Sequence, residues 1–287
     1  MIISASRRTD IPAYYPEWFI NRIKEGYVYV RNPMNFHQIS KVNLSPDLVD
    51  CIVFWSKNPA LMFDKLRFLN DYVYYFQFTL NPYDQDLETG LPPKKNIIET
   101  FKKLSDKIGP QRIIWRYDPV LLNTQCTVQY HIDKFNEIAS QLKGHTEKVT
   151  FSFIDFYKKI TANVKSHNII ETTIEEKNII AENFSKTAKE NNFFIDTCAE
   201  DIDLSNFNIE HARCIDDRLI AKIIGCTLAV KKDKNQRPKC GCVESIDIGV
   251  YNSCQSGCVY CYAGNYGAKK ISEGHNPLSP LLIGEEY

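Results

Sequence analysis

Short apolar runs rich in β-branched and aromatic residues alternate along the chain with longer segments of helical period. The short runs predict strands at residues 2–6, 49–55, 72–80, 112–117, 148–155, 193–197 and 245–251, with a brief extended piece at 27–31. The longer segments predict helices at 16–26, 60–69, 96–108, 128–142, 174–190 and 209–224. Repeated alternation of strand and helix indicates a parallel sheet whose helices form right-handed crossovers.

This order of elements predicts an α/β fold, and specifically an open or partial (β/α) barrel of the TIM type rather than a short doubly wound sheet. A chain of 287 residues suits one such domain, and it contains no linker long enough to separate two. The polar, mostly basic segment 231–240 is the best candidate for an internal boundary. We therefore expect residues 1–230 to form the partial barrel. Residues 231–287 should form a cysteine-rich, cluster-binding segment that completes the same domain.

Composition excludes several classes of protein. A content of 44% hydrophobic and 12% aromatic residues can fill a sizeable core, which argues against intrinsic disorder. Lys+Arg and Asp+Glu number 35 each, so the net charge gives no support for nucleic acid or an acidic membrane surface. No apolar run approaches the roughly 18 residues of a membrane span, and the first residues lack the order of a signal peptide. A cytoplasmic protein with no membrane partner is the resulting expectation.

Polar side chains follow most of the predicted strands at the point where each strand ends. Because the carboxyl ends of parallel strands meet at one mouth, these side chains should converge. We expect catalytic roles for Arg7, Asp10, Lys57, Arg116, Asp118 and Glu200, and cofactor binding by Arg8, Asn81 and Asp155. A mouth of mixed charge can bind a zwitterionic or phosphate-bearing ligand. At any single strand end, however, an Asn-Pro or Asp-Pro pair can simply end the strand and cap the next helix.

The ten cysteines are crowded toward the C-terminus. Only Cys51 and Cys126 lie in the first two-thirds, and the other eight lie between Cys198 and Cys261. In a reducing compartment such crowding favours metal ligation over disulfides. The spacing C-x3-C-x2-C of Cys254, Cys258 and Cys261 suits a cubane iron–sulfur cluster, which normally takes four thiolates. Three cysteines leave one iron open to a cosubstrate, as in a catalytic rather than a structural metal site.

The other late cysteines allow several interpretations. Cys240 and Cys242 form a close pair, and Cys198 and Cys214 lie upstream on loops or at a helix start. These four could hold an auxiliary cluster or a zinc ion, or one could supply a hydrogen atom or an electron during turnover. Inert buried thiols are the alternative, favoured for Cys51 and Cys226.

The run Tyr-Asn-Ser-Cys-Gln-Ser-Gly-Cys-Val-Tyr-Cys-Tyr-Ala at 251–263 resembles the C-x3-C-x-aromatic-C signature of the radical S-adenosylmethionine (SAM) superfamily. The resemblance implies that Cys254, Cys258 and Cys261 hold a [4Fe–4S] cluster whose unique iron chelates SAM. It implies that one-electron reduction, by a partner such as flavodoxin or ferredoxin, cleaves SAM to a 5′-deoxyadenosyl radical. Tyr260 would be the aromatic residue near the adenine and part of the cofactor site.

In that superfamily the cysteine loop usually follows the first barrel strand, whereas here it follows the last predicted one. A circular permutation would reconcile the two orders, with residues 245–251 as the first strand and residues 2–6 as the second. Nearly the whole chain also resembles the bacterial DUF1848 proteins. The shared features are Ser-Arg-Arg-Thr-Asp from Ser6, Trp-Ser-Lys-Asn-Pro from Trp55, Cys-Ile-Asp from Cys214, Cys-Gly-Cys from Cys240, and the terminal triplet.

The leading expectation is therefore a radical SAM-like iron–sulfur enzyme that binds SAM and an unknown substrate. Likeness of the motif to the spore photoproduct lyase version suggests a nucleic-acid lesion as one substrate, which the neutral net charge does not support. A first alternative is a metal- or cluster-stabilised barrel that binds a ligand without SAM chemistry. A second is a metal-independent hydrolase or lyase using Asp118, Asp155 or Glu200 as acid and base, which leaves the crowding of cysteines unexplained.

Overall fold

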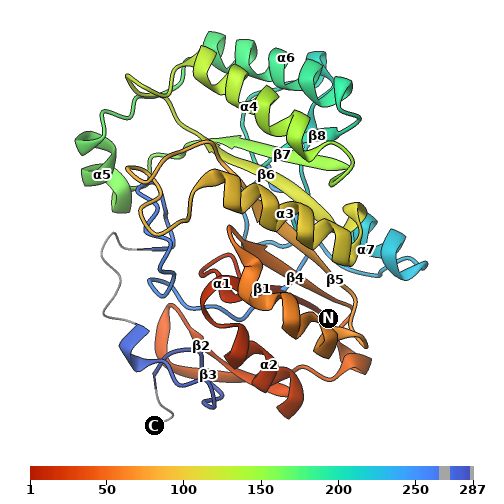
Figure 1. Ribbon diagram of the computed structural model, residues 1–287. Coiled ribbons are helices and arrows are strands. Elements are labelled where there is room, and N and C mark those ends of the chain that lie inside the picture. Colours follow the sequence, from red (N-terminus) through yellow and green to blue (C-terminus); the bar gives the residue numbers. More distant parts are fainter. Residues whose placement is uncertain (265–271, 285–287) are drawn as a thin grey trace.

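An eight-stranded parallel sheet forms the centre of the computed structural model, which describes residues 1–264 and 272–284 (Figure 1). Its strands are β1 (Ile2–Ala5), β4 (Cys51–Ser56), β5 (Tyr74–Thr79), β6 (Ile113–Val120), β7 (Lys148–Phe153), β8 (Phe194–Thr197), β9 (Glu210–His211) and β10 (Ile246–Asp247). They lie in the order β10-β1-β4-β5-β6-β7-β8-β9. Within these described ranges no ladder joins β9 to β10, so the α/β sheet is open.

The last strand along the chain pairs with the first one. β10 lies parallel to β1, with Ile246 opposite Ile3 and Asp247 opposite Ser4. The Asp247 carboxylate accepts hydrogen bonds from the hydroxyls of Ser4 (2.8 Å) and Ser6 (2.6 Å) and from the backbone N–H of Arg7 (2.8 Å). A strand of only two residues is thus fixed at the sheet edge largely by one buried side chain.

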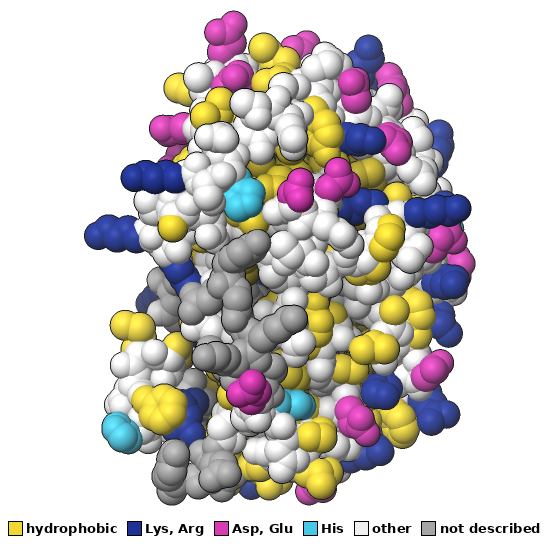
Figure 2. Space-filling view, turned by 60° about the vertical axis from the view of Figure 1, so that its left-hand side comes forward, with side chains coloured by type: hydrophobic (Ala, Val, Ile, Leu, Met, Phe, Trp, Pro, Cys, Tyr) yellow, Lys and Arg dark blue, Asp and Glu magenta, His cyan; other side chains and the backbone are white. Residues whose placement is uncertain are grey.

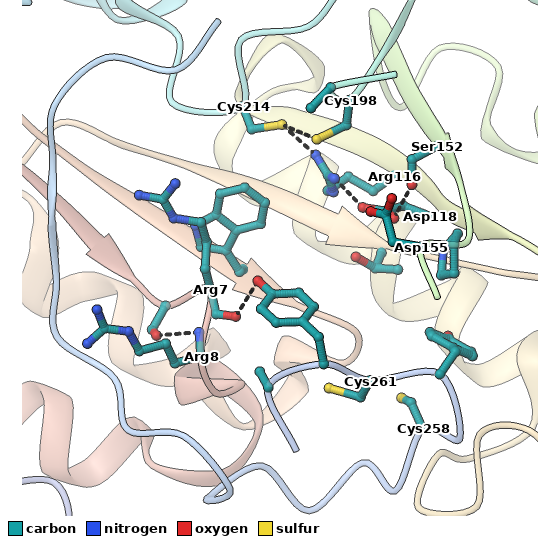
Figure 3. Close-up of a pocket in the computed structure, with 18 of the residues that line it drawn as sticks. Arg7, Arg8, Arg116, Asp118, Ser152, Asp155, Cys198, Cys214, Cys258 and Cys261 are labelled. Carbon is teal, nitrogen blue, oxygen red and sulfur yellow. Dashed lines mark hydrogen bonds and ion pairs between the residues drawn. The ribbon is translucent and has the colours of Figure 1, made fainter. Parts of the chain in front are cut away.

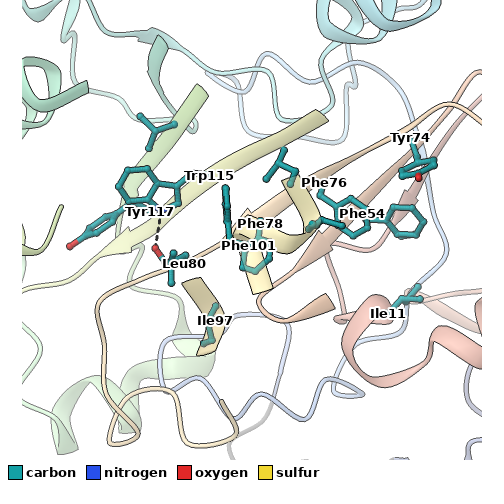
Figure 4. Close-up of a cluster of buried hydrophobic side chains, with 14 of the residues drawn as sticks. Ile11, Phe54, Tyr74, Phe76, Phe78, Leu80, Ile97, Phe101, Trp115 and Tyr117 are labelled. Atoms are coloured by element: carbon teal, nitrogen blue, oxygen red, sulfur yellow. Dashed lines mark hydrogen bonds between the residues drawn. The ribbon is translucent and has the colours of Figure 1, made fainter. Parts of the chain in front are cut away.

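Helices cover one face of the sheet. They are α1 (Ile11–Tyr14), α2 (Pro16–Glu25), α3 (Lys94–Ile108), α4 (Val128–Leu142) and α6 (Ile174–Glu190), and Figure 1 shows α3, α4 and α6 lying along the sheet. The two other helices pack elsewhere: α5 (Thr161–Ser166) contributes to the cluster around Val259, and α7 (Asp217–Ile224) lies on the opposite face. Phe78 of β5 packs on Phe101 of α3 with ring centroids 4.8 Å apart. Trp115 of β6 stacks on Phe135 of α4, also at 4.8 Å. These rings belong to the main hydrophobic core (Figure 4).

The C-terminal third of the chain, rather than a helix layer, covers the opposite face. Cys51, Val53 and Tyr75 point to this side and pack with residues of the segment 212–243, including Ile215 and Ile220. Because the strands make apolar contacts on both faces, their sequences are nearly continuous runs of apolar residues. This packing brings Cys198, Cys214, Cys240 and Cys242 against the face of the sheet opposite the main helices, which we call the inner face.

Two predicted helices differ from the structure. The segment predicted as a helix at 60–69 forms 3₁₀ turns, η2 (Pro59–Leu69), whose buried Met62, Leu66 and Leu69 recur at a spacing that either helix type allows. The segment predicted at 209–224 begins with β9, and only its end forms α7. The Asp216 side chain caps α7 by accepting from the N–H groups of Arg218 and Leu219, so the helix begins only at Asp217.

One strand prediction was too long, and another was confirmed but found only half of a hairpin. The segment 245–251 is a strand only at β10. The extended piece at 27–31 belongs to a two-stranded antiparallel hairpin of β2 (Tyr27–Asn32) and β3 (Asn35–Asn43). β3 escaped prediction because its side chains are mostly exposed and polar, so the sequence lacks a buried alternating face.

Charged side chains of both signs are spread over the face of the molecule in Figure 2. In that view, Lys and Arg do not gather into one continuous basic surface among the side chains described. None of the helices in the described parts of the chain is long and apolar enough to cross a membrane.

Candidate active site

A cavity of about 390 Å³ lies where the carboxyl ends of the strands meet (Figure 3). Residues that follow or end β1, β4, β5, β6, β7 and β8 line it, as expected for a barrel-like sheet. The predicted residues that line it are Arg7, Arg8, Asp10, Lys57, Arg116, Asp118, Asp155, Tyr260 and the cysteines Cys198, Cys214, Cys240, Cys242, Cys254, Cys258 and Cys261. Two other predicted residues, Asn81 and Glu200, do not belong to this lining.

The loop that carries the cysteine triplet follows β10 and docks on residues 87–90. Backbone hydrogen bonds run from Gly90 N to Ser256 O (2.9 Å) and from Val259 N to Leu87 O (3.0 Å). Gly257 has a φ of +62°, and a Cβ there would lie 2.1 Å from Thr89 Oγ1. Glycine is therefore needed at this position both for the backbone conformation and for the close approach.

The three thiols of the triplet reach the cavity from this loop. Cys258 is buried, and Cys254 and Cys261 are half-buried. Burial raises the pKa of Cys254 to about 11 and raises the pKa of Cys258 well above its ordinary value, although the nearby Lys57 ammonium opposes the second shift. Thiolates at these positions would therefore need a further cation, and a coordinated metal would supply that charge. The donor set fits a cluster with three protein thiolates.

Tyr260 lies over a buried polar cluster. Its hydroxyl accepts from Lys57 Nζ (2.9 Å) and from Asn81 Nδ2 (3.0 Å), and it donates to Glu88 Oε1. Burial opposes the charge on Glu88, but the ammonium groups of Lys57 and Lys94 hold the pKa of that carboxyl below its ordinary value. Asn81 thus supports Tyr260 from behind the cavity wall and is placed to orient it rather than to contact a ligand.

Arg116 links the inner face of the sheet to the cavity. Its buried guanidinium pairs with Asp118, donates to Cys214 Sγ at 2.9 Å and lies over the Trp55 ring at 5.1 Å. Asp118 also accepts from the Ser152 hydroxyl. Burial works against a charged guanidinium, but Cys214 and Asp118 raise the pKa of Arg116 well above its ordinary value, so this cation persists.

The residues after β1 carry two further cations, of which Arg7 also lies 3.7 Å from the Asp233 carboxylate through its Nη2. Arg7 Nη2 donates to Ser245 Oγ at 3.0 Å, and its Nε lies 3.9 Å from Asp247. The Arg8 guanidinium also lies 3.9 Å from Asp247. Asp10 has a structural role. Its carboxylate accepts hydrogen bonds from the backbone N–H of Ala13 (3.0 Å), as the N-cap of α1, and from the backbone N–H of Lys57 (2.8 Å). Burial raises the pKa of Asp10 to about 6 despite these donors.

Two acidic residues after β7 and β8 have different surroundings. The Glu200 carboxylate accepts a hydrogen bond from the backbone N–H of Phe153 at 2.8 Å and so stabilises the end of β7 behind the cavity. Burial raises the pKa of its carboxyl to about 7. Asp155 is half-exposed at the cavity and forms an ion pair with Arg237 at 2.5 Å. Of the two, only Asp155 is placed to meet a ligand.

Several site residues escaped the sequence analysis. Ser152 occupies a polar position that alternates with Phe151 and Phe153 along β7, a signal that could have identified it. Glu88 lies in a segment without regular periodicity, and nothing local marks it. Arg237 lies in the polar segment interpreted as a boundary, yet that segment contributes to the cavity wall.

The other four predicted metal-binding cysteines form a second group in the same cavity, and Cys198 Sγ lies 3.4 Å from Cys214 Sγ. In Figure 3 this pair and the pair Cys258 and Cys261 lie on opposite sides, with charged residues between them. Across the described residues, no three Cys, His, Asp or Glu side chains already converge as the ligands of one metal ion would.

Comparison with protein families matched the model described as "Domain of unknown function (DUF1848)" over residues 2–263. The chain belongs to the DUF1848 family. The matched range contains every strand of the sheet and both groups of cysteines, so the family model covers the whole candidate site. Comparisons with curated proteins and with solved structures gave no match.

Proposed function

We propose that this DUF1848 protein is a radical SAM-like enzyme, in which Cys254, Cys258 and Cys261 hold a [4Fe–4S] cluster that reductively cleaves SAM. The observation that carries the proposal is the position of the triplet. Its loop follows β10, β10 pairs with β1, and all three cysteines line the cavity at the strand ends. Pairing of β10 with β1 gives the strand neighbours that a permuted radical SAM barrel requires.

The number of thiolates supports an open metal site. A cubane cluster normally takes four thiolates, and this loop provides three. When bound, such a cluster supplies the electron that cleaves SAM to a 5′-deoxyadenosyl radical. The chain itself provides the Lys57 ammonium beside Cys258, which favours the thiolate form of that ligand.

The charged lining supports a zwitterionic ligand. The volume of about 390 Å³ lies within the usual range for pockets that bind small molecules. The contacts of Arg7 involve its Nε and Nη2, which meet Asp247, Asp233 and Ser245, and the ion pair of Arg8 with Asp247 involves its Nε, so other N–H groups of both guanidiniums can serve a ligand carboxylate. Asp155, half-exposed at the rim, is suited to an ammonium or a ribose hydroxyl.

The alternative is a barrel in which the cluster serves only stability. Its supporting observation is the firm docking of the triplet loop on residues 87–90. The two functions differ in one respect that can be measured, because only an enzyme of this kind has an iron that responds to SAM.

The test is anaerobic reconstitution of the full chain with iron and sulfide, followed by EPR of the reduced protein with and without SAM. We expect a cubane signal that changes when SAM is added, and formation of 5′-deoxyadenosine after reduction. Cys258→Ala should abolish both, whereas Cys126→Ala, which alters another buried cysteine, should abolish neither. A cluster indifferent to SAM, or retention of the cluster and activity by Cys258→Ala, would overturn the proposal.

A further inference from the structure

Two cysteines from different loops meet at the side of the cavity opposite the triplet. Cys198 follows β8 and is half-buried, and Cys214 lies between β9 and α7 and is buried. Their Sγ atoms are 3.4 Å apart, and both thiols line the cavity next to Arg116 (Figure 3). A disulfide bond is about 2 Å long, so the two sulfurs are adjacent but not bonded.

Main-chain contacts hold the two loops together independently of the thiols. β8 pairs with β9, and just beyond this pairing the Ala212 N–H donates to the Thr197 carbonyl at 2.7 Å. The backbone N–H of Cys198 donates to the Phe151 carbonyl of β7 at 2.9 Å. The short distance between the sulfurs is therefore a consequence of how the loops leave the sheet.

The main chain at Cys214 is also fixed from the sheet. Its carbonyl oxygen accepts hydrogen bonds from Tyr75 Oη and from Gln77 Nε2, each at 2.7 Å. Both donors belong to β5 and are buried. Cys214 consequently has a defined position on the inner face of the sheet, beside the cavity.

The backbone directly after Cys198 is strained. Ala199 has a φ of +55°, in the left-handed region that residues with a Cβ seldom adopt. Ala199 also lines the cavity. Strain of this kind persists where surrounding contacts impose it and is concentrated at functional sites, which marks this turn as part of one.

A buried cation faces the Cys214 sulfur, because Arg116 Nη1 donates to Cys214 Sγ at 2.9 Å. The Cys198 thiol and this guanidinium favour the Cys214 thiolate, whereas the Cys242 thiol and burial oppose it and raise the pKa of Cys214 to about 11. The pair is therefore held as two thiols until an oxidant reacts with it. During exchange the cation stabilises the Cys214 thiolate as it forms.

We infer that Cys198 and Cys214 are a redox-active pair that closes to a disulfide by exchange with a low-molecular-weight disulfide. Cys198 is the more exposed thiol, so its thiolate attacks one sulfur of the reagent and releases the other as a thiolate. The Cys214 thiolate, 3.4 Å away, then attacks the Cys198 sulfur and releases the second half of the reagent. Two cysteine thiols are oxidised, the reagent is reduced to two thiols, and these take up the two cysteine protons.

The new bond lies in the cavity wall, so its formation changes the surface that a ligand meets. The competing outcome is a bond between Cys214 and Cys242, whose thiols also interact. The Cys242 sulfur is already engaged, because it accepts from the backbone N–H of Ile215 at 3.3 Å. This contact favours Cys198 as the partner of Cys214.

Disulfide mapping of the full chain tests the pairing directly. The folded protein is incubated with oxidised glutathione in the absence of oxygen, free thiols are blocked with iodoacetamide, and the chain is cleaved with trypsin. Cleavage places Cys198 in the fragment 190–213 and Cys214 in the fragment 214–218, each with no other cysteine. Mass spectrometry therefore identifies a bond between these two fragments unambiguously.

We expect the two fragments to be linked in the wild type and to separate again after treatment with dithiothreitol. Cys214→Ser should instead accumulate a mixed disulfide of Cys198 with glutathione, because the resolving thiol is missing. Cys242→Ser should keep the link, as should the control Cys126→Ser, which alters a buried cysteine outside the cavity. Far-UV circular dichroism reports folding of each variant.

A wild-type chain that leaves the two fragments unlinked, or that joins Cys214 to Cys242, would overturn the inference, and this result needs no variant to fold. The inference does not depend on a cluster at the triplet. If the wild type responds to SAM but does not link the fragments, the redox-active pair alone fails. If it links them but its reconstituted form ignores SAM, the proposed function alone fails.

Discussion

Lys57 and Tyr260 come from opposite ends of the sequence, yet Lys57 Nζ lies 2.9 Å from the Tyr260 hydroxyl. The same ammonium pairs with the buried carboxylate of Glu88 at 2.7 Å. This contact connects the end of β4 to the loop that carries the cysteine triplet. It makes the stability of the cysteine loop depend on a charge at the carboxyl end of the sheet.

Lys57→Met should lower the free energy of unfolding by about 3 kcal/mol, because it removes one partner of a buried ion pair and leaves Lys94 as the remaining cation that pairs with Glu88. Urea denaturation measures the change. Lys134→Met, which breaks an exposed pair with Glu137 on α4, is the control and should cost less than about 1 kcal/mol. Equal effects in the two variants would show that the Lys57 pair does not anchor the loop.

Glu200→Gln tests the pH dependence of stability. Burial raises the pKa of Glu200 from 4.5 to about 7, so the folded state binds the proton more tightly than the unfolded state does. The resulting stabilisation is fully present below about pH 4.5 and is lost as the pH rises through 7.

The variant should therefore match the wild type near pH 4.5 and exceed it in free energy of unfolding by up to about 3 kcal/mol at pH 8. Urea denaturation across this range is the measurement. Glu182→Gln, at an exposed position of α6, should leave the wild-type pH dependence unchanged. A difference between Glu200→Gln and the wild type that does not vary with pH would contradict the prediction.

Gly257→Ala should destabilise the protein more than Gly26→Ala does. Both glycines have positive φ, so each substitution carries a backbone cost of about 1–2 kcal/mol. Only Gly257 also faces a contact, with Thr89 Oγ1 at 2.1 Å from the added Cβ, whereas nothing lies within 4 Å at Gly26.

The measurements are the free energy of unfolding and the reactivity of the thiols toward a soluble disulfide reagent. Reactivity should increase in Gly257→Ala as the cysteine loop loosens, and adding Thr89→Ala should recover part of the stability. Indistinguishable results for the two glycine variants would mean that the Thr89 contact adjusts without loss.

Arg7→Gln should weaken SAM binding about tenfold without changing the iron content, if the proposed function is correct. The expected size corresponds to one hydrogen bond to a charged group. Equilibrium binding of SAM to the reconstituted protein, together with iron analysis, is the measurement, and the exposed Arg67→Gln is the control. Loss of iron in Arg7→Gln would instead make Arg7 a structural support of the cysteine loop.

Local pattern sufficed for most elements of the sheet. The apolar runs that became β4, β5, β6 and β7 are buried on both faces, and this double burial leaves a continuous signal in the sequence. β3 and β9 left no such signal, because β3 is mostly exposed and β9 is an exposed strand of only two residues. Likewise η2 shares its apolar spacing with an α-helix, so sequence pattern alone could not separate the two.

The sequence by itself determined the α/β class, the family, and the cysteine triplet, because the spacing of three ligands on one loop is a local property. Only the tertiary structure decided that Cys198, Cys214, Cys240 and Cys242 face the triplet across one cavity, and that Glu88 lies beneath Tyr260. Such meetings depend on strand order and loop packing. Strand order and loop packing are determined by how large apolar surfaces are buried against one another, and a short stretch of sequence does not contain that information.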